Sequence, residues 1–339
     1  MHFPNTLKRR IAIALLLAIL LLLSLSSCGE RRELRSFTFY GSFDTVTTVT
    51  CYGTEGDAER FSTRVSQLLS HYHRLFDIYH DYVGTSNLKT LNDMAGIAPV
   101  SLDPEILSLL AYGLRIDEQT EGACRITYGA VLSIWHDYRT AGDSIPDPSL
   151  LAEASLHTAP ELLVLDRAAG TAYLTDPEAS VDVGAIAKGY AVERIADTLV
   201  DEGFTDFSLN VGGNLRLVGT TPRTVGIRDP EGSSVKLRFE MQSGSLVTSG
   251  NYERFYTVDG IRYHHLIDPE TAMPATKWAS VSVLTEDSAL ADALSTALFM
   301  LDYEDAVMMI ERIGEIEALW ISPEGEILST PGFPRGENN

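Results

Sequence analysis

The sequence is poor in cysteine and in basic residues. Only three of its 339 residues are cysteine, too few for a disulfide framework of the kind that holds small secreted domains together. Lysine and arginine number 26 against 47 aspartate and glutamate residues, which gives a formal net charge of −21. A surface of this sign repels nucleic-acid phosphates, so we expect no DNA or RNA partner. Any phosphate site in the chain must therefore be neutralised locally.

Several common catalytic and ligand-binding motifs are also missing. The chain contains no Gly-x-Gly-x-x-Gly fingerprint, no Walker A loop, no Gly-x-Ser-x-Gly elbow and no cysteine–histidine cluster with zinc spacing. It shows no internal repeat and no low-complexity tract. The sequence therefore gives no support to the dinucleotide, P-loop, hydrolase or zinc sites that these motifs mark.

The first 28 residues have the layout of an export signal. Three basic residues at positions 8–10 precede an apolar run over residues 11–23, which is shorter than the roughly 20 residues that a membrane-spanning helix needs. Leu-Ser-Ser-Cys then ends at Cys28, and this ending resembles a bacterial lipoprotein signal, in which the cysteine is lipidated. An ordinary signal peptide with a cysteine near the cleavage point is the alternative interpretation.

We therefore expect a signal peptide over residues 1–27, a tether over 28–36 and a folded domain over 37–335. Lipid on Cys28 would anchor the chain to a membrane, on its extracytoplasmic (periplasmic) side, without spanning it. Loss of residues 1–27 removes three basic and no acidic residues, so the net charge moves from −21 to about −24 (−21 − 3). Only Cys51 and Cys124 then remain, and the sequence leaves open whether they pair.

The remaining chain mixes two hydrophobic periodicities. Alternation predicts strands or hairpins over residues 37–52, 207–211, 225–228, 245–248 and 280–284. Helical spacing and capping residues such as Asp103 predict helices over 59–80, 103–118, 185–201 and 288–301. Residues 140–160, rich in Pro, Ala, Ser and Asp, are typical of a surface connection. The mixture predicts an α+β fold with helices packed on antiparallel sheet, as one domain of two intimately associated lobes.

Small residues crowd around a single lysine in the segment VDVGAIAKGYA, residues 181–191. A helix that starts near Ala185 would point free N–H groups outward, which favours a bound phosphate, and Lys188 would add a positive charge in its first turn. Gly184 leaves the backbone uncovered for a close ligand, and Asp182 could accept hydrogen bonds from that ligand. Close helix–sheet packing with a solvated Lys188 explains the same residues equally well.

Two further pairs of residues carry polar groups suited to chemistry. Asp292 and Thr296 lie four residues apart, so they share one face of a helix and could hold a hard cation such as Mg²⁺. His265 and Asp268 lie where a strand ends in a turn, and His265 could serve as a general base. Alone, each pair is explained better by local structure, as a threonine that bonds its own helix backbone and as a satisfied polar turn.

In combination, these segments resemble the ApbE family of bacterial FAD:protein FMN transferases. The resemblance covers roughly residues 37–310, and the combination is specific although no single motif is. An N-terminal lipoprotein signal is common in that family. The resemblance rests on Phe43-Asp44-Thr45 and on the segments LFDIY, SNLKTLN, CRITYGAVLSIW, VDVGAIAKGYAVERIADTL, LNVGGNLRLVG, VGIRDP, LVTSGNYERF, YHHLIDPETAMP and ADALSTALF.

The resemblance implies a reaction and its participants. FAD binds as the substrate with Mg²⁺ at its pyrophosphate, a Thr or Ser hydroxyl of an acceptor protein attacks the FMN-side phosphorus, and AMP leaves. FMN stays on the acceptor through a phosphoester, and typical acceptors are flavoprotein subunits of membrane redox complexes. Positioning and charge neutralisation supply most of the catalysis in phosphoryl transfer.

The resemblance also implies roles for individual residues. The backbone carbonyl of Ala185 and the side chains of Asp292 and Thr296 would hold Mg²⁺. His265, Asp268 and Asp292 are the expected catalytic residues. The residues expected to contact FAD are Phe43, Tyr79, Cys124, Arg125, Asp182, Lys188 and Ile267.

Three positions depart from the family pattern. Arg125 stands where the family usually has Asp, which reverses a charge near the nucleotide and could bind a phosphate or weaken specificity. Ala272 replaces a usual Gly, which narrows the allowed backbone geometry. Phe43-Asp44 replaces Met-Gly, which bears on how the flavin ring is held. None of these changes removes an expected metal ligand.

Three other functions fit parts of the same pattern. In an FAD pyrophosphatase, water replaces the acceptor hydroxyl at the same metal site, and FMN and AMP are released. A non-catalytic FAD-binding lipoprotein would account for the altered region around Arg125. A surface lipoprotein that binds a partner protein and no cofactor is the third. Flavin attached to an acceptor would mark the transferase, and free FMN would mark the pyrophosphatase. Unreacted FAD would mark the non-catalytic FAD-binding lipoprotein, and a chain that binds no flavin would mark the partner-binding lipoprotein.

Overall fold

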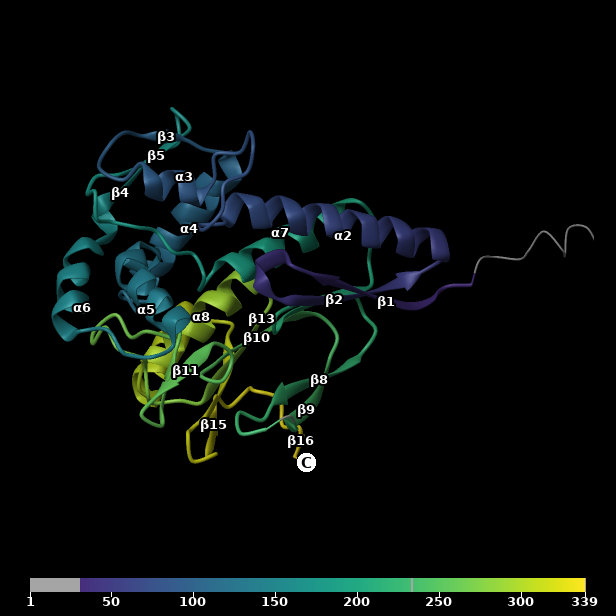
Figure 1. The fold of residues 1–339 in the computed structure, drawn as a ribbon. Coiled ribbons are helices and arrows are strands. Elements are labelled where there is room, and N and C mark those ends of the chain that lie inside the picture. Colours follow the sequence, from purple (N-terminus) through teal and green to yellow (C-terminus); the bar gives the residue numbers. More distant parts are fainter. Residues whose placement is uncertain (1–30, 233, 339) are drawn as a thin grey trace, which may run out of the picture.

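The computed structural model describes residues 31–232 and 234–338. At its centre is an eight-stranded sheet (Figure 1). Each neighbouring pair of strands in that sheet runs antiparallel, which confirms the predicted α+β class. In spatial order the strands are β1 (Glu33–Tyr40), β2 (Val46–Gly53), β6 (Phe207–Val211), β7 (Asn214–Val218), β10 (Gly244–Gly250), β13 (Ser280–Thr285), β14 (Glu317–Ile321) and β15 (Ile327–Ser329).

Three smaller antiparallel sheets surround the central one. The first consists of β16 (Glu337–Asn338), β9 (Val235–Met241) and β8 (Arg223–Arg228). The second consists of β3 (Val100–Ser101), β5 (Thr171–Leu174) and β4 (Leu163–Asp166). The third is a hairpin of β11 (Phe255–Val258) and β12 (Ile261–His264).

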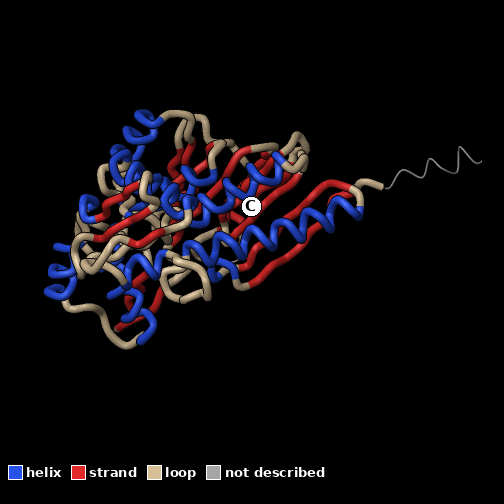
Figure 2. Tube along the Cα trace, turned by 90° about the horizontal axis from the view of Figure 1, so that it is seen from above, coloured by secondary structure: helices blue, strands red, loops and turns tan. Residues whose placement is uncertain are grey.

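The helices lie mainly on one side of the central sheet. The longest, α2, runs along the β1–β2 hairpin in both views (Figures 1 and 2), and α7 and α8 pack against each other and against the sheet. The helices of the described chain are α2 (Glu55–Phe76), α3 (Leu88–Asp93), α4 (Pro104–Gln119), α5 (Gly129–Ala141), α6 (Pro148–Ala154), α7 (Ala187–Asp201), α8 (Ser288–Met300) and α9 (Tyr303–Ile313). Short 3-10 turns are η1 (Ser42–Asp44), η2 (Ile126–Tyr128), η3 (Ser155–His157) and η4 (Pro160–Leu162).

The central sheet has a hydrophobic core on each face, and strand β14 shows why. Successive side chains of a strand point to opposite faces. Ala318 and Trp320 therefore pack into the core beneath the helices, whereas Leu319 and Ile321 pack into a second core against β8 and β9. The functional cavity lies on the helix-covered side, since α7 and α8 both contribute to it.

Several elements lie where the sequence placed them. The hairpin expected over residues 37–52 is β1–β2, but β1 begins at Glu33, so residues 33–36 belong to a strand and not to the tether. Asp103 caps α4 through a bond from the N–H of Glu105 to its carboxylate, as the Asp-Pro-Glu pattern predicts. Helix α8 matches its prediction to within one residue.

Two segments contain structure that the sequence did not predict. The helix placed at 59–80 is α2, which spans Glu55–Phe76 because Thr54 and Asp57 form a reciprocal capping box at its start. The connection expected over residues 140–160 contains helix α6, capped by Asp147.

Cys28 and the signal expected over residues 1–27 lie outside the described residues. No helix in the part of the chain that the structure covers combines the length and the apolar character needed to cross a bilayer. Cys51 and Cys124 are both buried and both free, so the described fold contains no bond between them.

Candidate active site

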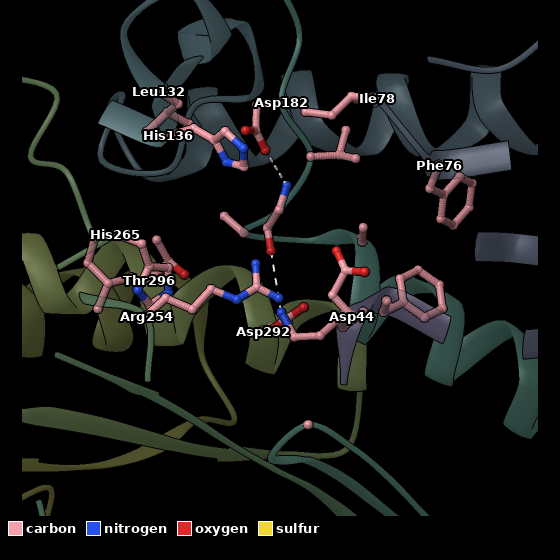
Figure 3. Close-up of a pocket in the computed structure, with 18 of the residues that line it drawn as sticks. Asp44, Phe76, Ile78, Leu132, His136, Asp182, Arg254, His265, Asp292 and Thr296 are labelled. Carbon is pink, nitrogen blue, oxygen red and sulfur yellow. Dashed lines mark hydrogen bonds between the residues drawn. The ribbon is translucent and has the colours of Figure 1, made fainter. Parts of the chain in front are cut away.

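One large cavity lies among the start of α7, helices α5 and α8, and the residues that flank the β11–β12 hairpin (Figure 3). Its volume is about 920 Å³, toward the upper end of the range for small-molecule sites. Every predicted site residue in the described chain except Asp268 lines it. The fold thus gathers into one cavity side chains that lie between positions 43 and 296 of the sequence.

The lysine-bearing segment forms a turn before it becomes helical. Helix α7 begins at Ala187, two residues later than predicted, and Lys188 lies in its first turn. Asp182 accepts a hydrogen bond from the N–H of Gly184 over 2.7 Å, which closes the turn. Nζ of Lys188 reaches back to the carbonyl of Gly184 over 3.4 Å. The turn therefore leaves Ala185 and the lysine at the cavity wall.

Gly189 brings helices α7 and α8 into close contact. Its N–H donates to Oδ2 of Asp292 over 2.7 Å. A Cβ at position 189 would approach the carbonyl of Ser288 and Cβ of Asp292 more closely than real Cβ atoms do. Close packing and ligand binding, which the sequence offered as alternatives for this segment, are therefore compatible, because the packing contact places the Asp292 carboxylate at the cavity.

Burial disfavours the charged form of two acidic groups in the cavity, Asp182 and Asp292. Burial raises the pKa of Asp292, and Lys188 and the N–H of Gly189 oppose that rise. Burial likewise raises the pKa of Asp182, against the effects of the Gly184 N–H and Arg254. Neither carboxylate forms an ion pair with a basic residue of the described chain. A bound cation would stabilise the charged form of each.

The oxygen atoms at the α8 end of the cavity suit a hard cation. Ala185 contributes a carbonyl, Asp292 a carboxylate and Thr296 a hydroxyl that lies 3.5 Å from Oγ of Ser249. Across residues 31–232 and 234–338, no three His, Cys, Asp or Glu side chains gather into a metal site. Mg²⁺ commonly takes one or two carboxylates and completes its shell with water and substrate phosphates, so this donor set fits Mg²⁺ shared with a bound phosphate.

His265 is a neutral imidazole at the cavity wall. Burial, followed by the positive charges of Arg254 and Lys188, lowers the pKa of His265 to about 3. Its buried Nδ1 has no hydrogen-bond partner among the described residues. The neighbouring His264 is structural by contrast, since its Nδ1 accepts from the N–H of Leu266 and its Nε2 then donates to the carbonyl of Ala275 over 2.7 Å.

Asp268 lies in the turn after β12 and does not line the cavity. Its carboxylate accepts the N–H of Glu270 over 2.8 Å, and its carbonyl accepts the N–H of Ala272. The contacts of Asp268 therefore form a turn. Its neighbour Ile267, which is buried, lines the cavity wall instead. Ala272 adopts φ 57°, the left-handed conformation that glycine favours.

Two aromatic residues of the cavity lining contact histidines. The N–H of Phe43 donates to Nδ1 of His73 over 3.2 Å, and the two rings meet edge to face. Phe43 has φ 55°, again in the left-handed region. Tyr79 stacks on His136 with ring centres 5.0 Å apart, and burial followed by Asp182 raises the pKa of Tyr79 to about 12.

Arg125 forms an ion pair with another residue of the chain. Its Nε donates to the buried carboxylate of Asp117 over 3.0 Å, so the cost of placing an arginine here is offset within the fold. Cys124 lies beside it, and burial raises the pKa of its thiol. The N–H of Cys124 bonds to the hydroxyl of Thr120. Both residues line the cavity, as predicted, but neither offers it a free charge.

The cavity lining also includes three basic side chains that the sequence did not predict. His136 and Arg139 come from α5, and Arg254 precedes β11. The helical signal was present, because His136 and Arg139 follow Leu132 at spacings of four and seven residues, on one helix face. Nothing in the local sequence marks Arg254, whose position depends on the β11–β12 pairing.

Comparisons with known proteins point to one family. A family model described as "ApbE family" matches residues 43–320. A relative from Treponema pallidum (strain Nichols), named FAD:protein FMN transferase, is 32% identical over 93% of this chain and 92% of its own length. A relative of the same name from Klebsiella pneumoniae (strain 342) is 29% identical over 80% and 86%.

Solved structures give the same result. The ApbE protein of Thermotoga maritima superposes with a TM-score of 0.80 at 26% identity, covering 89% of this chain and 98% of that one. The flavin transferase ApbE of Vibrio cholerae does so with a TM-score of 0.76 at 25% identity, covering 89% and 99%. The fold and the resemblance expected from the sequence are confirmed, and the chain belongs to the ApbE family.

Proposed function

We propose that this chain is an Mg²⁺-dependent FAD:protein FMN transferase, which moves FMN from FAD to a Thr or Ser hydroxyl of an acceptor protein and releases AMP. Relatives named for this activity align over most of both chains. The observation that carries the proposal is the bond from the Gly189 N–H to Asp292. It joins the lysine-bearing turn to the α8 carboxylate in a cavity of about 920 Å³.

The metal in this proposal is supported by the chemistry of the donors. The Ala185 carbonyl, the Asp292 carboxylate and the Thr296 hydroxyl would hold Mg²⁺, which when bound would neutralise charge on the pyrophosphate. Lys188 lies in the first turn of α7 and adds a second positive charge. This local field offsets the acidic character of the whole chain.

The transfer exchanges the phosphoanhydride bond of FAD for a phosphoester bond to the acceptor. The acceptor oxygen forms a bond to the FMN-side phosphorus while the bond from that phosphorus to the bridging oxygen breaks, and AMP leaves with that oxygen. His265 receives the hydroxyl proton, because its imidazole is neutral and its buried Nδ1 has no partner among the described residues. Bound phosphates would offset the charges of Arg254 and Lys188 and raise the pKa of His265 toward the working pH. Asp268 acts as a positioning residue that fixes the turn beside Ile267.

The cellular setting of the proposal comes from the N-terminus. A lipid on Cys28 would tether the enzyme to a membrane on the extracytoplasmic side, and the acceptor would be a flavoprotein subunit of a membrane redox complex. Metabolic labelling with a radioactive or alkyne-tagged fatty acid tests the anchor. Label that persists in Cys28→Ser contradicts it.

The test of the activity is a mass measurement. The purified chain is incubated with FAD, Mg²⁺ and a candidate acceptor, and the acceptor is weighed by mass spectrometry. A gain equal to one FMN phosphoester supports the transferase. Free FMN with an unmodified acceptor indicates a pyrophosphatase instead, and bound but unreacted FAD indicates a flavin-binding protein.

A further inference from the structure

Two arginines face the cavity from different elements, and the reaction described above assigns them no role. Arg139 comes from the last turn of α5, on the face that also presents Leu132 and His136. Arg254 comes from the residue before β11. Figure 3 shows Arg254 extending into the space between His265 and Asp292, with His136 and Asp182 on the opposite wall.

Arg254 is held beside His265 by the backbone. Phe255 pairs with His264 across the β11–β12 hairpin, so Arg254 and His265 are the next opposed positions in the same register. The N–H of His265 donates to the carbonyl of Arg254 over 3.0 Å. Side chains at directly opposed positions of an antiparallel pair share a face, and both of these line the cavity.

Neither guanidinium group is ion-paired among the described residues, although the charges of both act on Asp182 across the cavity. The hydrogen bond of Arg139 runs to Nδ1 of His136 over 3.3 Å. Burial and then the charge of Arg254 hold the pKa of Arg139 below its usual range. Two like charges that face one cavity in a chain of net charge −21 leave a site for an anion.

We propose that Arg139 and Arg254 form a phosphate-binding subsite, distinct from Lys188 and the α8 carboxylate, that takes the phosphate group of the flavin half of the substrate. The choice of half rests on the proposed function, because the phosphorus that the acceptor attacks is the flavin-side one and Arg254 stands beside the residue that receives the proton. Guanidinium donors there would also stabilise charge that develops on the phosphoryl oxygens during transfer.

The test compares the binding of FMN with that of riboflavin, which lacks the phosphate group. The difference between the two affinities separates phosphate binding from binding of the flavin ring. Binding is followed by flavin fluorescence in buffer with EDTA, so that no metal contributes. The full chain binds FMN more tightly than riboflavin. Arg254→Gln weakens FMN binding on the order of tenfold and R139Q/R254Q weakens it further, because each removes a charge-assisted donor. Riboflavin binding stays the same.

The matched control is Arg262→Gln, on the neighbouring strand β12 but over the ring of Phe255 and outside the cavity. It leaves both affinities unchanged. Equal FMN and riboflavin affinities in the parent chain would overturn the proposal, and so would equal losses for both ligands in R139Q/R254Q. Should the chain bind FMN in this pattern yet fail to modify an acceptor with FAD and Mg²⁺, the transferase proposal falls and the subsite stands.

Discussion

The backbone N–H of Gly189 on α7 donates to Oδ2 of Asp292 on α8 over 2.7 Å. This one bond couples two segments that lie 103 residues apart in sequence. It fixes the carboxylate against the turn that carries Ala185 and Lys188, and so it determines whether the oxygen donors and the lysine can act on the same ligand.

Replacement of Asp292 by Asn separates the metal function of this residue from its packing. The amide keeps the shape and can still accept the Gly189 N–H, but the charge is lost. We expect FMN transfer to fall on the order of 100-fold or more. Thermal stability without metal should stay the same or rise, because a buried carboxylate without an ion-pair partner is removed.

The measurement combines acceptor mass with thermal melts. In the parent chain, Mg²⁺ with FAD should raise Tm, since a ligand that binds only the folded state stabilises it; in Asp292→Asn the metal-dependent part of that shift should vanish. Asp305→Asn, at an exposed first-turn acid of α9, is the control. Parental transfer rates in the Asp292 variant at saturating FAD would remove this residue from the mechanism.

Replacement of Gly189 by Ala tests the packing side of the same contact. The new methyl group would press on the Ser288 carbonyl and on Cβ of Asp292, so we expect a loss of about 1–3 kcal/mol in the free energy of unfolding. Gly56→Ala is the control, since a Cβ at that position in α2 meets nothing within 4 Å. There the helix should gain roughly 0.5–1 kcal/mol. Urea unfolding of both variants checks the difference in sign.

Much of the fold could be predicted from local sequence patterns. Alternation placed the β1–β2 hairpin, and Asp103 before Pro104 placed the start of α4. The start of α2 was placed four residues late because the apolar spacing, and not the Thr54–Asp57 capping box, set the predicted bound. Local signals of this kind are readable because they depend on residues within one or two turns of each other.

Local sequence patterns predicted less of the candidate site than of the fold. Asp292 and Thr296 looked like ordinary helix residues until the family resemblance joined them to the 181–191 segment, and the contact that unites them runs through a backbone N–H. The position of Arg254 in the site could not be predicted from the sequence, because only the pairing register of the β11–β12 hairpin places it beside His265. Asp268 was predicted to be catalytic from its motif, whereas its side chain closes a local turn.

The buried imidazole of His265 should make stability depend on pH. Its pKa is about 3 in the folded chain, because of burial and the charges of Arg254, Lys188, His264 and Arg139, against about 6.5 in an unfolded chain. Between these values the unfolded state binds more protons, so stability is fully present above about pH 6.5 and falls as the pH drops toward 3.

Comparison with His265→Gln isolates this effect. The stability advantage of the variant over the parent should grow by up to about 1.4 kcal/mol per pH unit below pH 6.5, as measured by urea unfolding at a series of pH values. The same variant should lower the transfer rate more than FAD affinity, since Gln cannot accept the hydroxyl proton. Parallel stability curves for parent and variant would show that His265 titrates normally.

Ala272 should be a strained position. Its φ of 57° costs an L-residue roughly 1–2 kcal/mol, and the turn tolerates this because its N–H bonds to Asp268 and its carbonyl accepts from Nε1 of Trp135. Ala272→Gly relieves the strain but loses a buried methyl group and adds freedom to the unfolded chain. We expect a net gain of about 0.5–1 kcal/mol in unfolding free energy.

Ala275→Gly, at a buried alanine of the same loop without positive φ, should instead lose about 1 kcal/mol. Equal losses in both variants would mean that the 272 position carries no strain, and the family's usual glycine there would then have to serve close approach and not backbone conformation.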